Sequence, residues 1–314
     1  MKEILKQIKP ASILVIGDLM LDHYIIGNAS RISPEAPVPV VNIEKEYYRA
    51  GGASNVAANL IGIGMYPIAA GIIGKDRWGG RLLSLMKKRH IDCRAVIIDN
   101  SHITTSKTRV IAGNQQIVRF DREQTGEQGD SLIDALESKL KQSDRIAAII
   151  VSDYGKGVVT EKLVSQLKKL FPRRIIAVDP KVTNLSYYRG ATFLTPNQKE
   201  ASQMANIVIS DKKSLIEAGN RILEETEAQK LVITQGQDGM TIFENGSVKD
   251  IKATARYVYD VTGAGDSVIA VMTAAVANGI RFFDACRLAN VAGGISVSHP
   301  GTYQVLYEDI YNAL

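Results

Sequence analysis

Short runs of apolar residues recur along the chain and alternate with longer segments in which apolar residues return every three or four positions. The runs that predict strands are residues 13–16, 68–73, 147–151, 175–178, 192–194 and 231–234. The segments that predict helices are residues 78–90, 131–141, 161–170 and 213–224. Strands that alternate with helices form βαβ crossovers, which build a mainly parallel sheet with helices on both faces. The pattern therefore predicts an α/β fold of the doubly wound, three-layer type.

Polar residues and glycines follow several of the predicted strands. These strand ends are residues 17–18, 152–157, 179–181, 195–197 and 234–236. In an open α/β sheet, ligands bind at the carboxyl ends of the parallel strands. We therefore expect these ends to meet at one rim of the sheet and to form the floor of an active site.

Two stretches depart from this alternation. Residues 38–44 and 104–120 are typical of antiparallel strands, and the second stretch turns back on itself at residues 112–115. They predict a small β-sheet that projects from the main body as a lid, although an edge extension of the main sheet fits the pattern equally well. Because no internal repeat or linker is evident, we expect a single domain over residues 1–314.

Composition narrows the function without identifying it. With 314 residues and 45% hydrophobic content, the chain can bury a substantial core. Its net charge of +5 comes from 38 Lys and Arg against 33 Asp and Glu, without the dense basic runs of nucleic-acid binders. Small anionic substrates suit such a charge, and neither nucleic acid nor a membrane is an expected partner. The first apolar run is too short for a signal peptide or a membrane span, which predicts a cytoplasmic protein.

The most informative stretch is residues 260–267, in which a carboxylate follows a glycine turn at the start of a helix rich in small residues. The backbone N–H groups of Gly263, Ala264 and Gly265, together with the helix dipole, would stabilise charge on a transferred phosphoryl group. Asp266 would accept a proton from the attacking hydroxyl. A tight turn with a capping aspartate is the alternative, which this motif by itself does not exclude.

Four motifs occur in the order found in the ribokinase-like (PfkB) sugar kinases, which the sequence resembles. They are residues 17–22, 51–57, 197–200 and 260–266. Two further segments, residues 31–40 and 114–121, resemble the heptose 7-phosphate kinases within that family. Because the motifs span nearly the whole chain, the resemblance is far more specific than any one of them.

The resemblance implies a ribokinase-like fold and an enzyme that uses ATP and Mg²⁺. The implied reaction is phosphorylation of D-glycero-D-manno-heptose 7-phosphate at the C1 hydroxyl, which gives the 1,7-bisphosphate for ADP-heptose and lipopolysaccharide core biosynthesis. Some relatives also carry an adenylyltransferase part, whose His-x-x-His signature this sequence lacks. We therefore expect either a stand-alone kinase or the kinase part of a longer protein.

On the acceptor side, the resemblance assigns Asp22, Gly51, Gly52 and Asn55 to the sugar. A carboxylate and an amide suit polyol hydroxyls, and glycines let the backbone approach a ligand closely. The alternatives are a loop carboxylate for Asp22 and an ordinary helix-start residue for Asn55.

The acceptor of the resembling subgroup is a phosphate ester, so cations are expected around it. The basic candidates are Arg31, Lys107, Arg109, Arg119 and Lys156, and Asp153 is expected to contact either the sugar or metal-bound water. Arginine binds phosphate oxygens through two parallel hydrogen bonds. Solvated lid charges, or a surface ion pair in the case of Asp153 and Lys156, explain the same residues.

On the nucleotide side, Asn197 and Glu200 match the motif that organises Mg²⁺ near the ATP phosphates in the family. Taken alone, they would be a helix N-cap and a first-turn glutamate. The remaining ATP candidates are Thr234, Gly236, Gly239 and Asn290, and residues 296–302 are expected to border the adenine. Asp260 and Thr262 match a site for a monovalent cation, such as K⁺, in some members of the family.

Several functions remain open at the level of sequence. A heptose 7-phosphate kinase is favoured, and a related kinase acting on a ketose, ribose or nucleoside is the nearest alternative. A sugar- or nucleotide-sensing protein without turnover is a third reading, against which the retained Asp266 argues. An oxidoreductase is disfavoured because no Gly-x-Gly-x-x-Gly follows the first strand. The apolar residues of the expected lid also predict a homodimer formed through it.

Overall fold

The main sheet has nine strands in the described part of the chain, which in this computed structural model comprises residues 1–113, 115–140, 145–255 and 257–314. The strand order is β13-β12-β11-β10-β9-β8-β1-β4-β5. The strands are β1 (Ser12–Gly17), β4 (Tyr66–Gly74), β5 (Asp92–Asp99), β8 (Ile146–Ser152), β9 (Ile175–Asp179), β10 (Phe193–Leu194), β11 (Lys230–Thr234), β12 (Met240–Glu244) and β13 (Ser247–Ile251). Neighbours from β11 to β5 pair in parallel, whereas β12 and β13 are added antiparallel at one edge.

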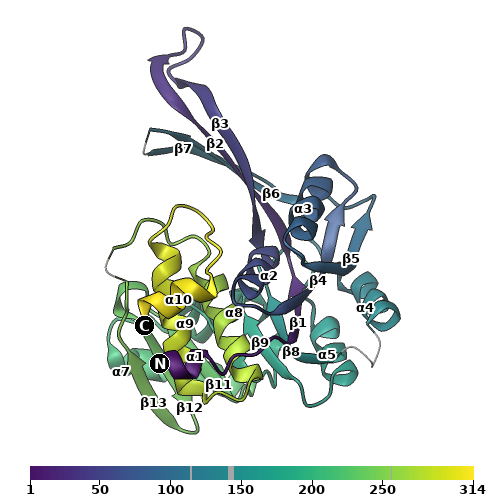
Figure 1. Ribbon diagram of the computed structural model, residues 1–314, viewed down its shortest axis with the longest axis vertical. Coiled ribbons are helices and arrows are strands. Elements are labelled where there is room, and N and C mark those ends of the chain that lie inside the picture. The colour runs from purple at the N-terminus through teal and green to yellow at the C-terminus, as the bar shows by residue number, and fades with distance from the viewer. Residues whose placement is uncertain (114, 141–144, 256) are drawn as a thin grey trace.

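Helices cover both faces of the main sheet because its central strands are apolar on both sides. In β1, Ile13 and Val15 pack into one core, and Leu14 and Ile16 pack into the other. The first core is completed by α1 (Lys2–Leu5), α2 (Ala53–Gly62), α3 (Arg77–Lys88), α8 (Ala264–Ala277), α9 (Phe282–Val297) and α10 (Tyr307–Ala313). The second core is completed by α4 (Gly129–Lys139), α5 (Glu161–Leu170), α6 (Gln198–Ala205) and α7 (Lys212–Thr226). The three-layer α/β fold is therefore confirmed (Figure 1).

A separate four-stranded sheet consists of β2 (Leu19–Ile32), β3 (Pro39–Gly52), β6 (Thr105–Ala112) and β7 (Gln115–Arg122), in the order β3-β2-β6-β7. We call it the projecting sheet, because its β2–β3 ribbon extends far from the main body in Figure 1. β2 pairs antiparallel with β3 and parallel with β6, and β6 pairs antiparallel with β7. The predicted second sheet is thus confirmed, and the alternative of an edge extension is wrong.

The projecting sheet is larger than the sequence pattern predicts. The pattern predicts neither β2 nor the extension of β3 to Gly52, and β5, β12 and β13 are also missing from the prediction. The outer half of the β2–β3 ribbon is largely exposed, so no buried face imposes the period of two that marks a strand. Residues 114 and 141, which end or begin predicted segments, lie outside the described residues. None of the described helices combines the length and apolar character needed to cross a membrane.

Candidate active site

Asp266 is the centre of the candidate site. It is buried in the first turn of α8. Asn55 Nδ2 donates a hydrogen bond to its Oδ2 at 2.8 Å, and the Tyr154 hydroxyl donates one to its Oδ1 at 2.8 Å. Burial raises the pKa of Asp266 to about 6, although both hydrogen bonds oppose the rise. The carboxylate is therefore oriented by two donors and ionised at neutral pH, as a general base requires.

Residues 263–265, at the start of α8, are the expected anion hole, and we call them the anion-hole turn. Gly263 is the N-cap of α8 with a φ of 80°, a left-handed conformation that glycine adopts without strain. A Cβ atom on Gly263 would lie 2.8 Å from Asn55 Nδ2, so a side chain there would displace the amide that holds Asp266. Gly263, Ala264 and Gly265 line a pocket, described below, at the N-terminus of α8. Backbone N–H groups at a helix N-terminus stabilise anions.

A pocket of about 670 Å³ adjoins this turn. All of the ATP candidates line it, namely Asn197, Glu200, Thr234, Gly236, Gly239 and Asn290. Asp153, Asp179 and Thr195, which lie at or just beyond the ends of β8, β9 and β10, line it as well. Its volume is within the range of small-molecule and cofactor sites. The expected gathering of polar strand ends at one rim is thus confirmed for these strands.

Asn197 and Glu200 form a reciprocal capping box at the start of α6. Glu200 N donates to Asn197 Oδ1 at 2.9 Å, and Asn197 N donates to Glu200 Oε2 at 2.9 Å. Burial raises the pKa of Glu200 above its ordinary value. The N-cap alternative is therefore correct as a description of the local structure, and it leaves a carboxylate at the wall of the pocket. Because no group of three or more metal-ligating side chains was found among the described residues, an Mg²⁺ ion here would be held largely by phosphate and water.

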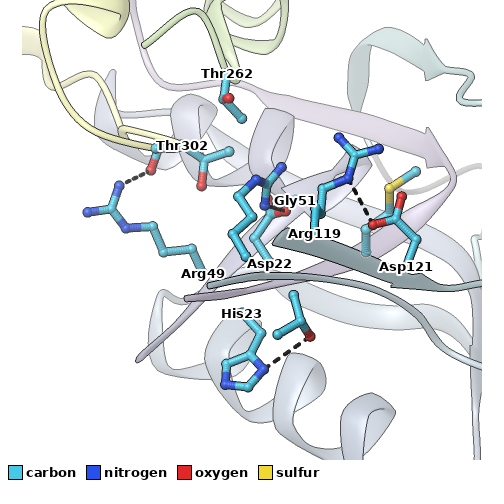
Figure 2. Close-up of polar contacts among 12 residues, drawn as sticks. Asp22, His23, Arg49, Gly51, Arg119, Asp121, Thr262 and Thr302 are labelled. Carbon is cyan, nitrogen blue, oxygen red and sulfur yellow. Dashed lines mark hydrogen bonds and ion pairs between the residues drawn. The ribbon is translucent and has the colours of Figure 1, made fainter. Parts of the chain in front are cut away.

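The structure brings Asp22 and Gly51 together at the base of the projecting sheet (Figure 2). Asp22 is buried within β2, so the alternative of a loop carboxylate is wrong. Arg109 Nη1 on β6 lies 2.6 Å from Asp22 Oδ1. A Cβ atom on Gly51 would lie 2.5 Å from Asp22 Oδ2, which explains the glycine there, and Gly52 has a φ of 55°. Burial raises the pKa of Asp22 even though Arg109 opposes the rise.

The basic candidates on the projecting sheet do not all lie at its base. Lys107 and Arg109 lie on β6 beside the base, and Lys107 Nζ is 5.5 Å from the centre of the Tyr154 ring. Arg119 lies opposite Arg109 on β7 and pairs with Asp121 at 3.0 Å (Figure 2). Arg31 is exposed near the outer end of β2, on the ribbon that extends from the body. The structure thus brings Lys107 and Arg109 to the site and leaves Arg31 apart from it.

Asp153 and Lys156 do not form the surface ion pair that was the alternative for them. Asp153 is buried, accepts a hydrogen bond from Gly155 N at 2.7 Å and accepts another from Tyr188, at the end of the 3-10 helix η1 (Val182–Tyr188). Lys156 Nζ pairs with Glu123 at 2.7 Å. Asp153 lines the pocket, whereas the ammonium group of Lys156 forms an ion pair with Glu123.

Sequence reasoning missed the roles of Tyr154 and Asp18. Asp18 is buried after β1 and accepts backbone hydrogen bonds from Tyr154 N at 2.8 Å and Lys156 N at 3.1 Å. Burial, together with the neighbouring carboxylate of Asp153, raises the pKa of Asp18 to about 6. Asp18 thereby holds the loop that presents Tyr154 to Asp266. The only sequence signal was the polar ends of the two strands.

Asp260 and Thr262 lie beside the anion-hole turn. Asp260 Oδ1 accepts a hydrogen bond from Thr262 N, and Oδ2 accepts one from Gly301 N, each at 2.9 Å. Burial would raise the pKa of Asp260, but these hydrogen bonds outweigh it and keep the pKa below its ordinary value. Of residues 296–302, expected near the adenine, Val297 lines the pocket, whereas Thr302 lies against Gly263. Thr302 is not among the residues that line this pocket, and the placement of residues 296–302 near the adenine stays a prediction.

The sequence matches the family described as pfkB family carbohydrate kinase over residues 10–309. It is 46% identical over 308 residues to bifunctional protein HldE of Geobacter sulfurreducens, and 40% identical over 310 residues to that of Helicobacter hepaticus. These alignments cover 96% of this chain but 62% and 63% of the two relatives. The chain therefore spans about three fifths of the length of these curated relatives.

Solved structures share the fold at lower identity. Phosphofructokinase-2 from Escherichia coli in complex with substrates and products aligns with a TM-score of 0.78 at 19% identity, covering 97% of this chain and 98% of that one. Arabidopsis thaliana ribokinase complexed with ribose and ATP aligns with a TM-score of 0.76 at 15% identity, with the same coverage. At such identities the likeness concerns the fold alone.

Proposed function

The chain belongs to the pfkB family of carbohydrate kinases, and from this premise we propose that it phosphorylates D-glycero-D-manno-heptose 7-phosphate at the C1 hydroxyl. The products are ADP and the 1,7-bisphosphate, for ADP-heptose and lipopolysaccharide core biosynthesis. The observation that carries the proposal is Asp266, held by Asn55 and Tyr154 between the pocket and the base of the projecting sheet. As a member of this family, the chain is an ATP-dependent sugar kinase.

The proposed reaction follows from the positions of the residues. Asp266 accepts the proton of the C1 hydroxyl as the C1 oxygen bonds to the γ-phosphorus, and the bond from that phosphorus to the bridging oxygen of ADP breaks. The N–H groups of residues 263–265 stabilise the negative charge on the transferred group. Mg²⁺, when bound, neutralises charge on the phosphates. Asn197 and Glu200 are its proposed holders, with Glu200 acting through water.

Three observations support a phosphorylated heptose as the acceptor. The segment at residues 31–40 resembles heptose 7-phosphate kinases, and relatives at 40 to 46% identity are called bifunctional protein HldE. Lys107 and Arg109 also lie beside the base, where Asp22 and Asn55 would hold sugar hydroxyls. Arg119, opposite Arg109 on β7, is a further candidate for the phosphate, whereas Arg31 would need a second copy of the chain to supply it because it lies apart from this site. A cytoplasmic location belongs to it too, since ATP is abundant there.

A monovalent cation such as K⁺ is proposed next to Asp260 and Thr262. The hydroxyls of Ser296 and Thr302 are buried and lack a hydrogen-bond partner among the described residues, which fits oxygen ligands for such an ion. K⁺ would stabilise the anion-hole turn when bound. Turnover measured in potassium and in tetramethylammonium salts of equal ionic strength tests this, and equal rates would argue against it.

A screen of ADP release tests the acceptor. The expected result is highest kcat/KM with heptose 7-phosphate among that sugar, fructose 6-phosphate, fructose and ribose, with phosphorus NMR locating the new phosphate on C1. A preference for fructose 6-phosphate or ribose would contradict the proposal and indicate a related kinase with another acceptor. ATP consumption without transfer to any sugar would instead favour a sensing protein.

A further inference from the structure

Arg49 takes no part in the proposed reaction, but it connects the projecting sheet to a loop near the active site. It lies on β3 directly opposite Asp22 in the β2–β3 ladder, two residues before Gly51. Its Nη1 donates to Pro300 O at 2.8 Å and to Thr302 O at 2.6 Å. Figure 2 shows Arg49 extending from the projecting sheet toward Thr302. One guanidinium nitrogen therefore ties the base of the projecting sheet to the loop that follows α9.

That loop is in turn attached to the anion-hole turn. Gly301 N donates to Asp260 Oδ2, while Asp260 Oδ1 accepts from Thr262 N, so one carboxylate bridges the loop and the turn. A Cβ atom on Gly263 would lie 3.2 Å from Thr302 Cγ2, which shows how closely the loop backs the turn. The contacts form a continuous chain from Arg49 through Pro300–Thr302 and Asp260 to Gly263.

The surroundings of Arg49 limit its freedom. Its guanidinium carbon is 5.3 Å from the Tyr47 ring centre and 5.9 Å from that of Tyr24, and these two rings stack at 4.9 Å. A Cβ atom on Gly301 would lie 2.7 Å from the Tyr24 hydroxyl oxygen and 3.3 Å from Arg49 Nη1, so the glycine leaves room for both side chains beside the loop. Cation–π contacts and two carbonyl acceptors fix the side chain in one geometry.

We infer that Arg49 is a positioning residue that couples the acceptor-binding base of the projecting sheet to the anion-hole turn. By holding the loop at Pro300–Thr302 in place, Arg49 keeps the N–H groups of residues 263–265 in position. A movement of β3 would therefore shift these N–H groups. A contiguous hydrogen-bonded chain is a physical route for coupling, and coupling itself must be measured. The kinetic part of this inference rests on the proposed phosphoryl transfer, whereas its structural part does not.

Hydrogen–deuterium exchange on the full chain, with and without Mg²⁺ and the ATP analogue AMP-PNP and without any sugar, tests the structural part. Arg49→Ala is expected to raise exchange at residues 260–265 and 299–303 by about three- to tenfold, because the ordered turn opens more often. Arg81→Ala is the matched control. Arg81 belongs to α3, and its guanidinium carbon lies 4.0 Å from the ring centre of Tyr48 on β3, so it contacts the same strand from another element. Unchanged exchange at residues 260–265 in Arg49→Ala would overturn the inference.

A pair of conservative variants separates positioning from folding. Both bonds start from a single nitrogen, so the ammonium of Arg49→Lys can supply them, whereas Arg49→Met keeps length but no donor. We expect Arg49→Met to lower kcat about 10- to 100-fold on the sugar that the wild type phosphorylates best, with the KM for ATP within about threefold. Arg49→Lys should recover most of kcat and of the exchange protection. Equal behaviour of the Lys and Met variants would overturn the inference, as would a loss confined to the acceptor KM, which would make Arg49 a direct acceptor contact.

Discussion

The hydroxyl of Tyr154 donates a hydrogen bond to Oδ1 of Asp266 across 2.8 Å, from a loop 112 residues away in the sequence. This bond stabilises the ionised carboxylate and so lowers its pKa against the effect of burial. Because a base acts only when deprotonated, kcat should fall as the pH drops through about 6.

Tyr154→Phe removes the donor and should raise the pKa of Asp266 further. The acid limb of the pH profile of kcat is then expected to move upward by about one pH unit, the equivalent of a hydrogen bond to a charged group. Tyr187→Phe is the control, since the Tyr187 hydroxyl donates its hydrogen bond to Glu127 and not to Asp266. An acid limb that stays in place in Tyr154→Phe would show that this tyrosine does not set the state of the base.

Asp266→Asn should abolish the proton acceptor while keeping the shape of the site. Turnover is expected to fall by ~10²–10⁴, the usual span for a lost general base. Calorimetric titration should give nearly unchanged affinities for the nucleotide and the sugar. Near-normal turnover by the folded variant would reject Asp266 as the base.

The same substitution should stabilise the fold in a pH-dependent way. The pKa of Asp266 in the folded state, about 6, lies above its ordinary value of 3.8, so the folded protein binds more protons than the unfolded chain between these values. Stability conferred by the wild-type residue is therefore lost as the pH rises through this window and stays lost above it. Relative to the wild type, Asp266→Asn should gain about 2 kcal/mol more free energy of unfolding near pH 8 than near pH 4.5.

Urea denaturation at the two pH values measures this difference. Asp134→Asn, on the exposed side of α4, provides a comparison for a carboxylate that is not buried. A gain that is the same at both pH values would mean that burial of the charge is not its cause.

Substitution of the phosphate contact should affect one class of acceptor. If Lys107, Arg109, Arg119 or Arg31 binds the 7-phosphate, its change to Ala should cost about 2–4 kcal/mol in kcat/KM on heptose 7-phosphate. Activity on the unphosphorylated heptose should hardly change. Arg109→Ala also leaves Asp22 without its partner, so it is compared with the double variant Arg109→Ala/Asp22→Asn. Equal losses on both acceptors in all four single variants would mean that these residues shape the projecting sheet without reading the phosphate.

The projecting sheet is expected to pair two copies of the chain. Ile43, Ile117, Val118 and Phe120 are large apolar side chains exposed on it, and a two-fold related copy would cover them. Light scattering at micromolar concentration should give twice the chain mass of 34.2 kDa, and Phe120→Glu should shift the protein toward the monomer. Tyr66→Glu, which alters an exposed aromatic at the start of β4, is the control. A monomeric wild type, or a dimer unaffected by Phe120→Glu, would contradict this interface.

The sequence by itself determined the layered core and the chemistry of the anion-hole turn. The apolar runs at β1 and β8 are buried on both faces, so burial alone marks them, and residues 260–266 carry their glycines and carboxylate in one continuous segment. The pocket-lining glycines and polar strand ends were also predictable, because each lies within a short continuous segment next to a predicted strand or helix.

Tertiary structure decided which side chains meet. Arg49 and Thr302 are separated by 253 residues and Asn55 and Asp266 by 211, and such contacts depend on strand order and crossovers that no local period records. The extent of the projecting sheet also depends on tertiary structure. The outer part of its β2–β3 ribbon has no buried face, so its sequence does not need to alternate between apolar and polar residues. Local burial shapes the sequence where it acts, while contacts between distant segments leave no such periodic signal.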